Sequence, residues 1–245
     1  MAIRKTQEEF IKQSKRIFGD LLDYSLVEYK NRRTKVTLVC KYHGLLNSNQ
    51  YYLVKSKPDY LCKICIQNKH IKFRTEVLSA YSPSLECALC GENNLEFLAL
   101  DHCNGGGVRD MKNHGGQCSL WYALKRHEYP DGYRVLCHNC NHTQRIVNIY
   151  RSESNNRDRV KIKSEVIGYY GGGCECCETD DFEVLCIDHI NGGGRAQARE
   201  IKLQGSNFNY YWLKRNGFPA GYRVLCYNCN MAKGFYGTCP HEGVV

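Results

Sequence analysis

Paired cysteines constrain this chain more than any other feature of its sequence. The 245 residues include 16 cysteines, which form five Cys-x-x-Cys pairs and one Cys-x-x-His pair. Each pair presents two ligands from one tight turn, and two such pairs complete the tetrahedron that a structural zinc ion requires. The spacing therefore predicts several small modules stapled by zinc, because modules of this size bury too little surface to be stable unaided.

Three zinc sites can be assembled from these pairs, one in each third of the chain. The predicted ligand sets are Cys40, His43, Cys62 and Cys65; Cys87, Cys90, Cys137 and Cys140; and Cys174, Cys177, Cys226 and Cys229.

Five cysteines remain outside these sets, and small buried hydrophobes are their plain interpretation. They are Cys103, Cys118, Cys176, Cys186 and Cys239. Cys176 adjoins Cys177 and could compete with it as a ligand, while Cys239 and His241 form an extra pair without obvious mates.

The character of the N-terminus and the net charge indicate a compartment and a partner. The stretch "MAIRKTQEEFIKQSKR" is charged throughout, unlike a signal peptide, and no apolar run is long enough to span a membrane. We therefore expect a cytoplasmic protein, because in a reducing intracellular setting thiolate-metal chemistry is favoured over disulfides. A net charge of +9 indicates a polyanionic partner, most simply nucleic acid, although a basic protein without such a partner is the alternative.

A long internal duplication organises the rest of the chain. "CALCGENNLEFLALDHCNGGG" from Cys87 aligns with "CECCETDDFEVLCIDHINGGG" from Cys174, and "GYRVLCHNCN" from Gly132 returns as "GYRVLCYNCN" from Gly221. The distance from the first cysteine to the Asp-His pair is the same in both copies (101 − 87 = 14; 188 − 174 = 14). We predict three modules, residues 1–65, 66–150 and 151–245, the last opening with the polar linker "RSESNNRDR".

The first module has its own secondary-structure signals. Thr6 followed by Glu9 predicts a capping box, and Phe10, Ile11, Ile17 and Phe18 would share one helical face. "TKVTLVC" alternates as a strand does. Helices and short strands together predict the α+β class.

The order of motifs in each repeat, Cys-x-x-Cys, Asp-His, Cys-x-x-Cys-Asn, resembles the ββα-metal (HNH-type) nucleases. It is most similar to the recombination endonuclease VII family of phages, and the resemblance covers both repeats. The N-terminal stretch "DYSLVEYKNRRTKVTLVCKYHG" with "LCKIC" is similar to a small zinc-binding domain found ahead of nuclease domains in phage and homing endonucleases.

This resemblance implies a divalent-metal-dependent DNA endonuclease. His102 and His189 would be the general bases, while zinc would be scaffold rather than catalyst. Two residue pairs would hold magnesium or a similar ion, namely Asp101 with Asn141 and Asp188 with Asn230. The expected elements are strands over "FLALDH", "EVLCIDH" and both copies of "YRVLC", with helices beginning at Asn141 and Asn230.

Other interpretations of the sequence stay open. A non-catalytic zinc-containing DNA-binding protein would share the scaffold and the charge, and a structural interaction protein would need neither the charge nor the Asp-His pairs. The duplication itself predicts a monomer with an internal pseudo-dimer, with a homodimer as the alternative. Segments "LWYALKR" and "YYWLKR" predict core aromatics followed by phosphate-contacting Lys125, Arg126, Lys214 and Arg215.

Overall fold

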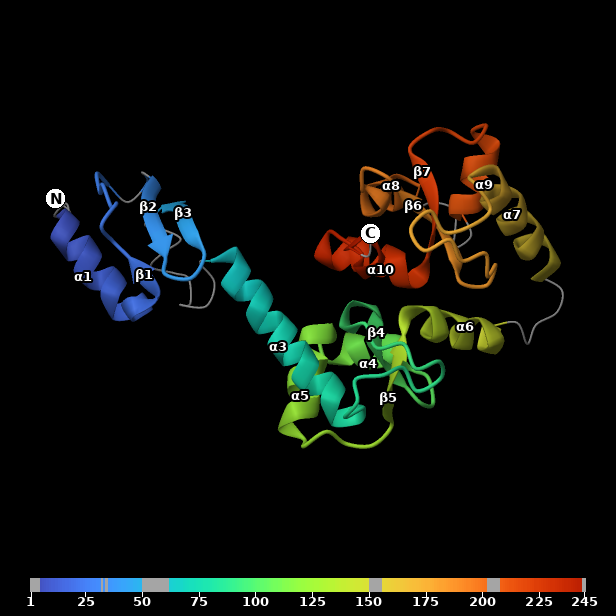
Figure 1. The fold of residues 1–245 in the computed structure, drawn as a ribbon, viewed down its shortest axis with the longest axis horizontal. Coiled ribbons are helices and arrows are strands. Elements are labelled where there is room, and N and C mark those ends of the chain that lie inside the picture. The colour runs from blue at the N-terminus through green and yellow to red at the C-terminus, as the bar shows by residue number, and fades with distance from the viewer. Residues whose placement is uncertain are drawn as a thin grey trace. The chain divides into compact units, whose positions relative to one another are not determined.

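The computed structural model describes residues 5–31, 33, 35–49, 62–149, 156–201 and 208–243. It divides into two compact units, Met1–Glu76 and Val77–Val245. Each unit combines helices with a small antiparallel sheet or sheets, which confirms the α+β class (Figure 1). The predicted boundary at residues 65 and 66 falls inside helix α3 (Lys63–Tyr81), whereas the units divide at Glu76 and Val77. The second unit therefore contains the first predicted repeat from Val77 onward and the whole of the second.

In its described residues the first unit contains helix α1 (Gln7–Phe18), a three-stranded sheet and the larger part of α3. Its capping box forms as predicted, because the backbone N–H of Glu9 donates to Thr6 Oγ1 at 3.2 Å and the backbone N–H of Thr6 donates to the Glu9 carboxylate at 2.9 Å. The strands are antiparallel in the order β1-β2-β3. The elements are α1 (Gln7–Phe18), η1 (Gly19–Leu21), β1 (Leu22–Asp23), β2 (Lys35–Cys40) and β3 (Gly44–Asn49).

The core of the first unit is formed by one face of α1 and alternate residues of β2. Phe10 and Phe18 are buried, and Ile11 and Ile17 pack against the same cluster while partly exposed. This arrangement confirms the predicted apolar face of the helix. Along β2, buried and less buried residues alternate as expected for a strand with one face on the core.

The second unit contains the two repeats, and each has the same order of elements. The first comprises the end of α3, η3 (Leu95–Phe97), β4 (Leu98–His102), α4 (Gly107–Asn113), α5 (Gln117–Arg126), β5 (Tyr133–Cys137) and α6 (His138–Ile149). The second comprises α7 (Asn156–Tyr169), β6 (Leu185–His189), α8 (Gly194–Glu200), α9 (Phe208–Arg215), β7 (Tyr222–Cys226), α10 (Tyr227–Tyr236) and η5 (Pro240–Gly243).

The strand pairs of the two repeats have the same register. In the first repeat β4 and β5 are antiparallel and His102 lies opposite Tyr133, while in the second β6 and β7 are antiparallel and His189 lies opposite Tyr222. The duplication in sequence is therefore a duplication of structure, and each strand pair leads directly into a helix (Figure 1).

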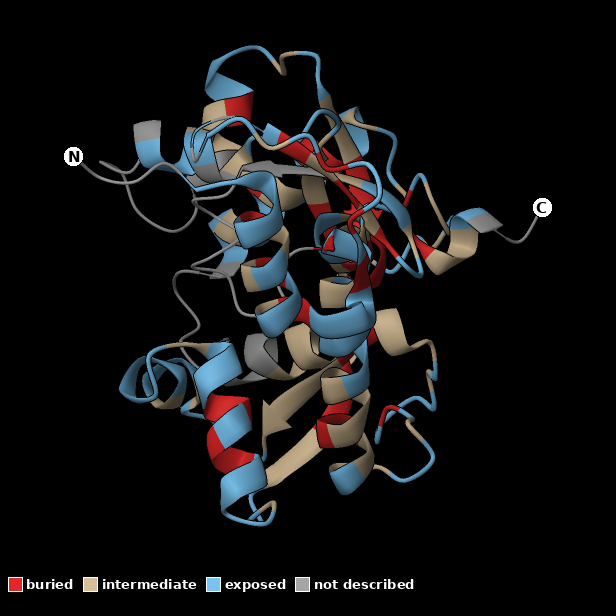
Figure 2. Ribbon diagram, turned by 90° about the vertical axis from the view of Figure 1, so that its left-hand side faces the viewer, coloured by how far each residue is buried: buried red, intermediate tan, exposed pale blue. Residues whose placement is uncertain are grey.

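The largest hydrophobic cluster in the described residues contains side chains of both repeats. It includes Leu98 and Leu136 from the first repeat and Leu185 and Leu225 from the second, each at most 1% exposed. A smaller cluster lies within the second repeat and is formed by Ile162, Val166 and Leu213. Helix α10 packs against α6 and against η3 of the first repeat. Buried residues form short runs between exposed ones along the helices, as expected for a small core (Figure 2).

The predicted helix starts at Asn141 and Asn230 are wrong by three residues. Helix α6 begins at His138 and α10 at Tyr227. The cause is the second Cys-x-x-Cys pair of each repeat, the predicted zinc knuckle from which the helix starts. Cys226 Sγ accepts the backbone N–H of Cys229 at 3.5 Å and so caps the helix. Cys137 Sγ accepts the N–H of Cys140 at 3.4 Å in the same way.

Two further sequence predictions have structural outcomes. Residues 156–159 of the predicted linker belong to α7, and its residues 151–155 lie outside the described part of the chain. None of the helices within the described ranges combines the length and apolar character that a membrane crossing requires.

Candidate metal centres and active sites

The structure brings together each of the three predicted ligand quartets. In each quartet all ligand atoms lie within 4.8 Å of one another. A tetrahedral zinc ion with bonds of about 2.3 Å to sulfur separates its sulfur ligands by about 3.8 Å. The Sγ–Sγ separations are 3.8 Å between Cys40 and Cys65, 3.7 Å between Cys90 and Cys137, and 3.8 Å between Cys177 and Cys226. The quartets therefore have the dimensions of zinc sites.

The first quartet uses one histidine nitrogen. His43 Nδ1 lies 3.6 Å from Cys40 Sγ, 3.3 Å from Cys62 Sγ and 3.2 Å from Cys65 Sγ. Zinc bonds of about 2.0 Å to nitrogen and 2.3 Å to sulfur give a nitrogen–sulfur separation of about 3.5 Å. Nδ1 is therefore the atom of His43 that can bind zinc together with the three thiolates.

The thiols of one quartet have very different pKa values, so without a cation they do not all become thiolates near neutral pH. Burial opposes ionisation of Cys87, but backbone N–H groups, first that of Cys137, lower the pKa of Cys87 to about 7. Burial raises the pKa of Cys137 to about 11, and burial likewise raises the pKa of Cys65 in the first unit to about 12. A divalent ion removes this conflict, since a metal-bound thiol is deprotonated outright.

A fourth ligand group, which the sequence did not predict, lies in the second repeat. It consists of Cys176, Cys229, Cys239 and His241, and their ligand atoms also lie within 4.8 Å of one another. The sequence favoured small buried hydrophobes and left Cys176 as a possible competing ligand and Cys239 with His241 as a possible extra pair; the structure places all three residues in one ligand group. The sequence signal for this group was the spacing of Cys239 and His241, and the fold brings Cys176 and Cys229 to them as the other two ligands.

The other three unassigned cysteines divide by exposure. Cys186 is buried, as expected for a small hydrophobe, whereas Cys103 and Cys118 are exposed. The prediction of burial is wrong for these two because Cys103 follows the last residue of β4 and Cys118 lies in the first turn of α5.

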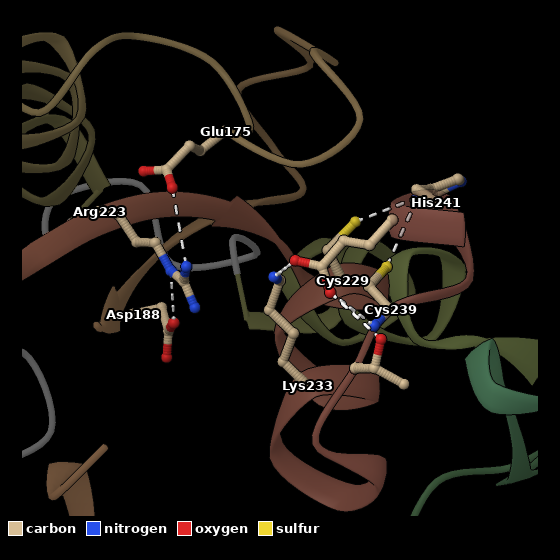
Figure 3. A network of polar contacts seen from close by, with 9 residues as sticks. Glu175, Asp188, Arg223, Cys229, Lys233, Cys239 and His241 are labelled. Atoms are coloured by element: carbon tan, nitrogen blue, oxygen red, sulfur yellow. Dashed lines mark hydrogen bonds and ion pairs between the residues drawn. The ribbon is translucent and has the colours of Figure 1, made fainter. Parts of the chain in front are cut away.

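Each predicted Asp-His pair ends a strand, and its aspartate forms a cross-strand ion pair. Arg134 Nε donates to Asp101 Oδ2 at 3.0 Å. In the second repeat Arg223 Nε donates to Asp188 Oδ2 at 2.9 Å, and the same guanidinium lies 3.6 Å from Glu175 (Figure 3). Sequence analysis missed these partners, although each arginine occupies the same position in the repeated "YRVLC".

In the first repeat the imidazole of His102 is held by a carboxylate from α4. His102 Nε2 lies 2.8 Å from Asp110 Oδ2, and the Tyr133 hydroxyl donates to the same oxygen at 2.9 Å. Hydrogen bonds from His102 and then Tyr133 lower the pKa of Asp110. Burial, with the neighbouring Asp110, raises the pKa of Tyr133 to about 12. Asp110 is therefore a fixed, charged partner of the imidazole.

The second repeat has the same arrangement with a neutral partner. His189 Nε2 lies 2.6 Å from Gln197 Oε1, and Gln197 Nε2 donates to the Tyr222 hydroxyl. The histidine and tyrosine rings are 4.7 Å apart in both repeats. Asp110 and Gln197 each follow their histidine by eight residues (110 − 102 = 8; 197 − 189 = 8), a matched position that the sequence analysis did not use.

The last glycine of each triple-glycine run lies against the imidazole ring. A Cβ added at Gly107 would be 2.8 Å from His102 Nδ1, and one added at Gly194 would be 3.0 Å from His189 Nδ1. Any side chain there would press on the ring nitrogen that does not face Asp110 or Gln197. The two glycines therefore keep the space beside Nδ1 open in both repeats.

The predicted asparagines lie in the first turns of α6 and α10, which pack against β4 and β6. Asn230 Nδ2 donates to Cys186 Sγ at 3.2 Å. Cys186 precedes Asp188 by two residues, so both side chains lie on the same face of β6 as Asn230. Ala99 occupies the position in the first repeat that matches Cys186 and has no sulfur to accept such a bond, so this contact is specific to the second repeat.

Comparison with known proteins reaches the first unit only. Residues 3–66 match the family described as "Protein of unknown function (DUF723)". No curated protein and no solved structure matches the chain.

Proposed function

We propose that this chain is a divalent-metal-dependent DNA endonuclease of the ββα-metal (HNH) type, similar to the recombination endonuclease VII family of phages. The observation that carries the proposal is the duplicated histidine arrangement. In both repeats a histidine at the end of a strand is held through Nε2, while a glycine keeps the space at Nδ1 open. A histidine that only filled space would not require both features twice.

The held histidine has the properties of a general base. Asp110 Oδ2 and Gln197 Oε1 are acceptors, so Nε2 is the donor in both repeats, and in the neutral form of the ring Nδ1 then keeps its lone pair. A neutral imidazole takes a proton from water near pH 7. His102 and His189 would therefore activate the water that attacks the phosphodiester, and Asp110 would attract the positive charge that His102 gains.

In each repeat the aspartate and the asparagine offer oxygen atoms that suit a hard divalent ion such as magnesium. Asn230 donates through Nδ2, which leaves its amide oxygen as the ligand atom, and Asp188 is bonded through Oδ2, which leaves Oδ1. Asp101 with Asn141 offers the same atom types in the first repeat. When bound, the ion would supply Lewis-acid stabilisation of the phosphate and of the departing oxygen.

DNA is the proposed partner, and positively charged residues at two helix ends are candidate phosphate contacts. Lys125 and Arg126 end α5 and are exposed, and Lys214 and Arg215 end α9 and are exposed. Lys214 also pairs with Glu165 at 2.6 Å. The first unit would add a further DNA-binding surface. Two sites in one chain would let a monomer cut both strands, which a homodimer does with one site per chain.

A non-catalytic zinc-containing DNA-binding protein is the second candidate. The ion pairs between Arg134 and Asp101 and between Arg223 and Asp188 favour it, because each guanidinium already neutralises a carboxylate that the nuclease would use for metal. The two candidates differ in whether the protein breaks DNA.

The deciding experiment incubates the purified full chain with supercoiled, linear and branched DNA, with and without magnesium. We expect cleavage that requires the ion, and loss of cleavage with retained DNA binding in the double variant His102→Ala/His189→Ala. Cleavage at the wild-type rate in that variant would rule out the proposed bases. If the protein binds DNA but cleaves none of the substrates, with either magnesium or manganese present, the non-catalytic DNA-binding protein would be established.

A further inference from the structure

The segment after α10 brings two additional ligands to the second repeat's knuckle. His241 Nδ1 lies 3.3 Å from Cys229 Sγ and 3.7 Å from Cys239 Sγ (Figure 3). Cys176 completes the group, with all ligand atoms within 4.8 Å. Cys229 belongs both to this group and to the third predicted quartet.

The geometry and burial of this group match those of the other quartets. The two nitrogen–sulfur distances are close to the separation of about 3.5 Å expected around a tetrahedral zinc ion. Cys229 is fully buried and Cys239 is 2% exposed. Cysteines that served only as small hydrophobes would have no reason to place their sulfur atoms around one point together with an imidazole nitrogen. The convergence of these four side chains therefore indicates a metal site.

We propose that the second repeat holds a binuclear zinc-thiolate centre in which the Cys229 thiolate bridges the two ions. One ion would bind Cys174, Cys177, Cys226 and Cys229, and the other would bind Cys176, Cys229, Cys239 and His241. Two four-coordinate ions that share one ligand need seven residues (4 + 4 − 1 = 7), and the two groups contain seven. A single ion in either group would leave three buried or half-buried ligands unused.

The residues around the additional ligands hold them in place. Glu242 accepts the backbone N–H of Cys239 at 3.1 Å and the Thr238 hydroxyl at 3.3 Å. Its other oxygen pairs with Lys233, which lies on α10. This clamp fixes the short loop that carries Cys239 and His241, the role that outer groups have around metal ligands.

The additional ion would act at the junction of the two repeats. The His241 ring lies 5.0 Å from the ring of Phe97, which is fully buried and belongs to η3 of the first repeat. Zinc bound to His241 would therefore tie the end of the chain to the core that both repeats share.

The first repeat provides an internal control because it lacks the additional ligands. Leu89, which is 50% exposed, occupies the position that matches Cys176. Counted from the second knuckle, Tyr150 and Ser152 stand where the second repeat has Cys239 and His241. The first repeat's quartet is thus mononuclear, and Cys140 is the unshared counterpart of Cys229.

The first test counts zinc by native mass spectrometry and elemental analysis of the full chain. The triple variant Cys176→Leu/Cys239→Ser/His241→Ala should hold one zinc ion fewer than wild type. Cys140→Ser should make one ion labile to a chelator, whereas Cys229→Ser should make two labile. Equal zinc content in wild type and the triple variant would overturn the proposal.

The second test detects the bridge in the wild-type chain, and its cadmium measurement needs no folded variant. After exchange of zinc for ¹¹³Cd, two cadmium resonances should show scalar coupling to each other through the shared sulfur. Cobalt substitution should show a magnetically coupled pair, which the triple variant converts to isolated ions. Uncoupled ions throughout would refute the bridging role of Cys229. Neither readout depends on nuclease activity.

Discussion

Asn139 and Asn228 exchange hydrogen bonds with each other. The backbone N–H of Asn139 donates to Asn228 Oδ1 at 2.9 Å, and the backbone N–H of Asn228 donates to Asn139 Oδ1 at 2.9 Å. The two residues occupy the same position within the second knuckle of each repeat. A reciprocal contact between equivalent residues is the hallmark of a two-fold interface, which here lies within one chain.

Removing one of these side chains should destabilise the second unit. Asn228 is 5% exposed, and its side-chain oxygen accepts the backbone N–H of Asn139. Asn228→Ala removes this acceptor and leaves the N–H unpaired. We expect the free energy of unfolding to fall by about 1–3 kcal/mol, the usual effect of leaving a buried polar group unpaired. Denaturant unfolding measures the change, with the exposed Asn93→Ala as a control within about 0.5 kcal/mol of wild type. Equal stability of both variants would contradict a stabilising contact.

Stripping zinc should unfold the chain. Structural zinc contributes on the order of 10 kcal/mol of apparent binding free energy in small zinc peptides, and these modules have small cores. We expect a strong chelator to abolish the tertiary circular dichroism signal and zinc to restore it, with at least one ion bound per predicted quartet. Retention of the folded signal after complete zinc removal would show that the cores suffice alone.

The charge on Asp110 should stabilise the fold in a pH-dependent way. Its pKa is lowered in the folded chain by hydrogen bonds from His102 and Tyr133, so its contribution is fully present above the ordinary carboxyl pKa of 3.8 and is lost as pH falls through the lowered value. The stability difference between wild type and Asp110→Asn should shrink in acid, as the pH falls below the ordinary carboxyl pKa of 3.8 and through the lowered value. A difference that grows as pH falls below the ordinary carboxyl range would contradict this linkage. The matched control Gln197→Asn carries no charge and should show no acid dependence of its own.

Alanine at Gly107 or Gly194 should impair cleavage and spare binding. The new Cβ would lie 2.8 Å or 3.0 Å from the histidine Nδ1, so the ring must shift or the proton-accepting atom is blocked. We expect a roughly 100-fold or greater loss of the cleavage rate at the altered site, comparable to loss of a general base. Gly168→Ala in α7 has open space around it and is the control. Unchanged cleavage in Gly107→Ala/Gly194→Ala would place the reacting atoms elsewhere.

Inactivating one repeat should convert a double-strand cutter into a nickase. His102→Ala and His189→Ala each leave one complete set of Asp, His and Asn, and the shared core keeps both sites on one body. Supercoiled plasmid that wild type linearises should be opened only to the nicked circle, on opposite strands by the two variants. Loss of both cuts in one variant and no change in the other would instead reveal a single working site.

Local patterns in the sequence predicted much of this architecture. Each "YRVLC" forms a strand over the five predicted residues, and the Cys-x-x-Cys spacing identified three quartets that the fold brings together. Both depend on short-range geometry, namely the two-residue period of a strand and the tight turn of a knuckle.

Features that depend on tertiary packing could not be predicted in the same way. Cys176 and Cys239 are 63 residues apart (239 − 176 = 63), and only the turn after α10 brings them together. Asp110 reaches His102 because α4 folds back over the end of β4, a path that no local pattern specifies. The helix starts were misplaced because a cysteine sulfur replaced the usual oxygen cap.

The sulfur caps of α6 and α10 link metal capture to the order in which each repeat folds. Forming the first turn is the slow, unfavourable step in making a helix, and here that turn contains the second ligand of the knuckle. We therefore expect an ion bound by the knuckle to nucleate the helix rather than to bind a helix that has already formed. Asn141 and Asn230, each one residue beyond that ligand, would gain their orientation at the same moment, so a chain that has not captured its metals would have no assembled site for DNA.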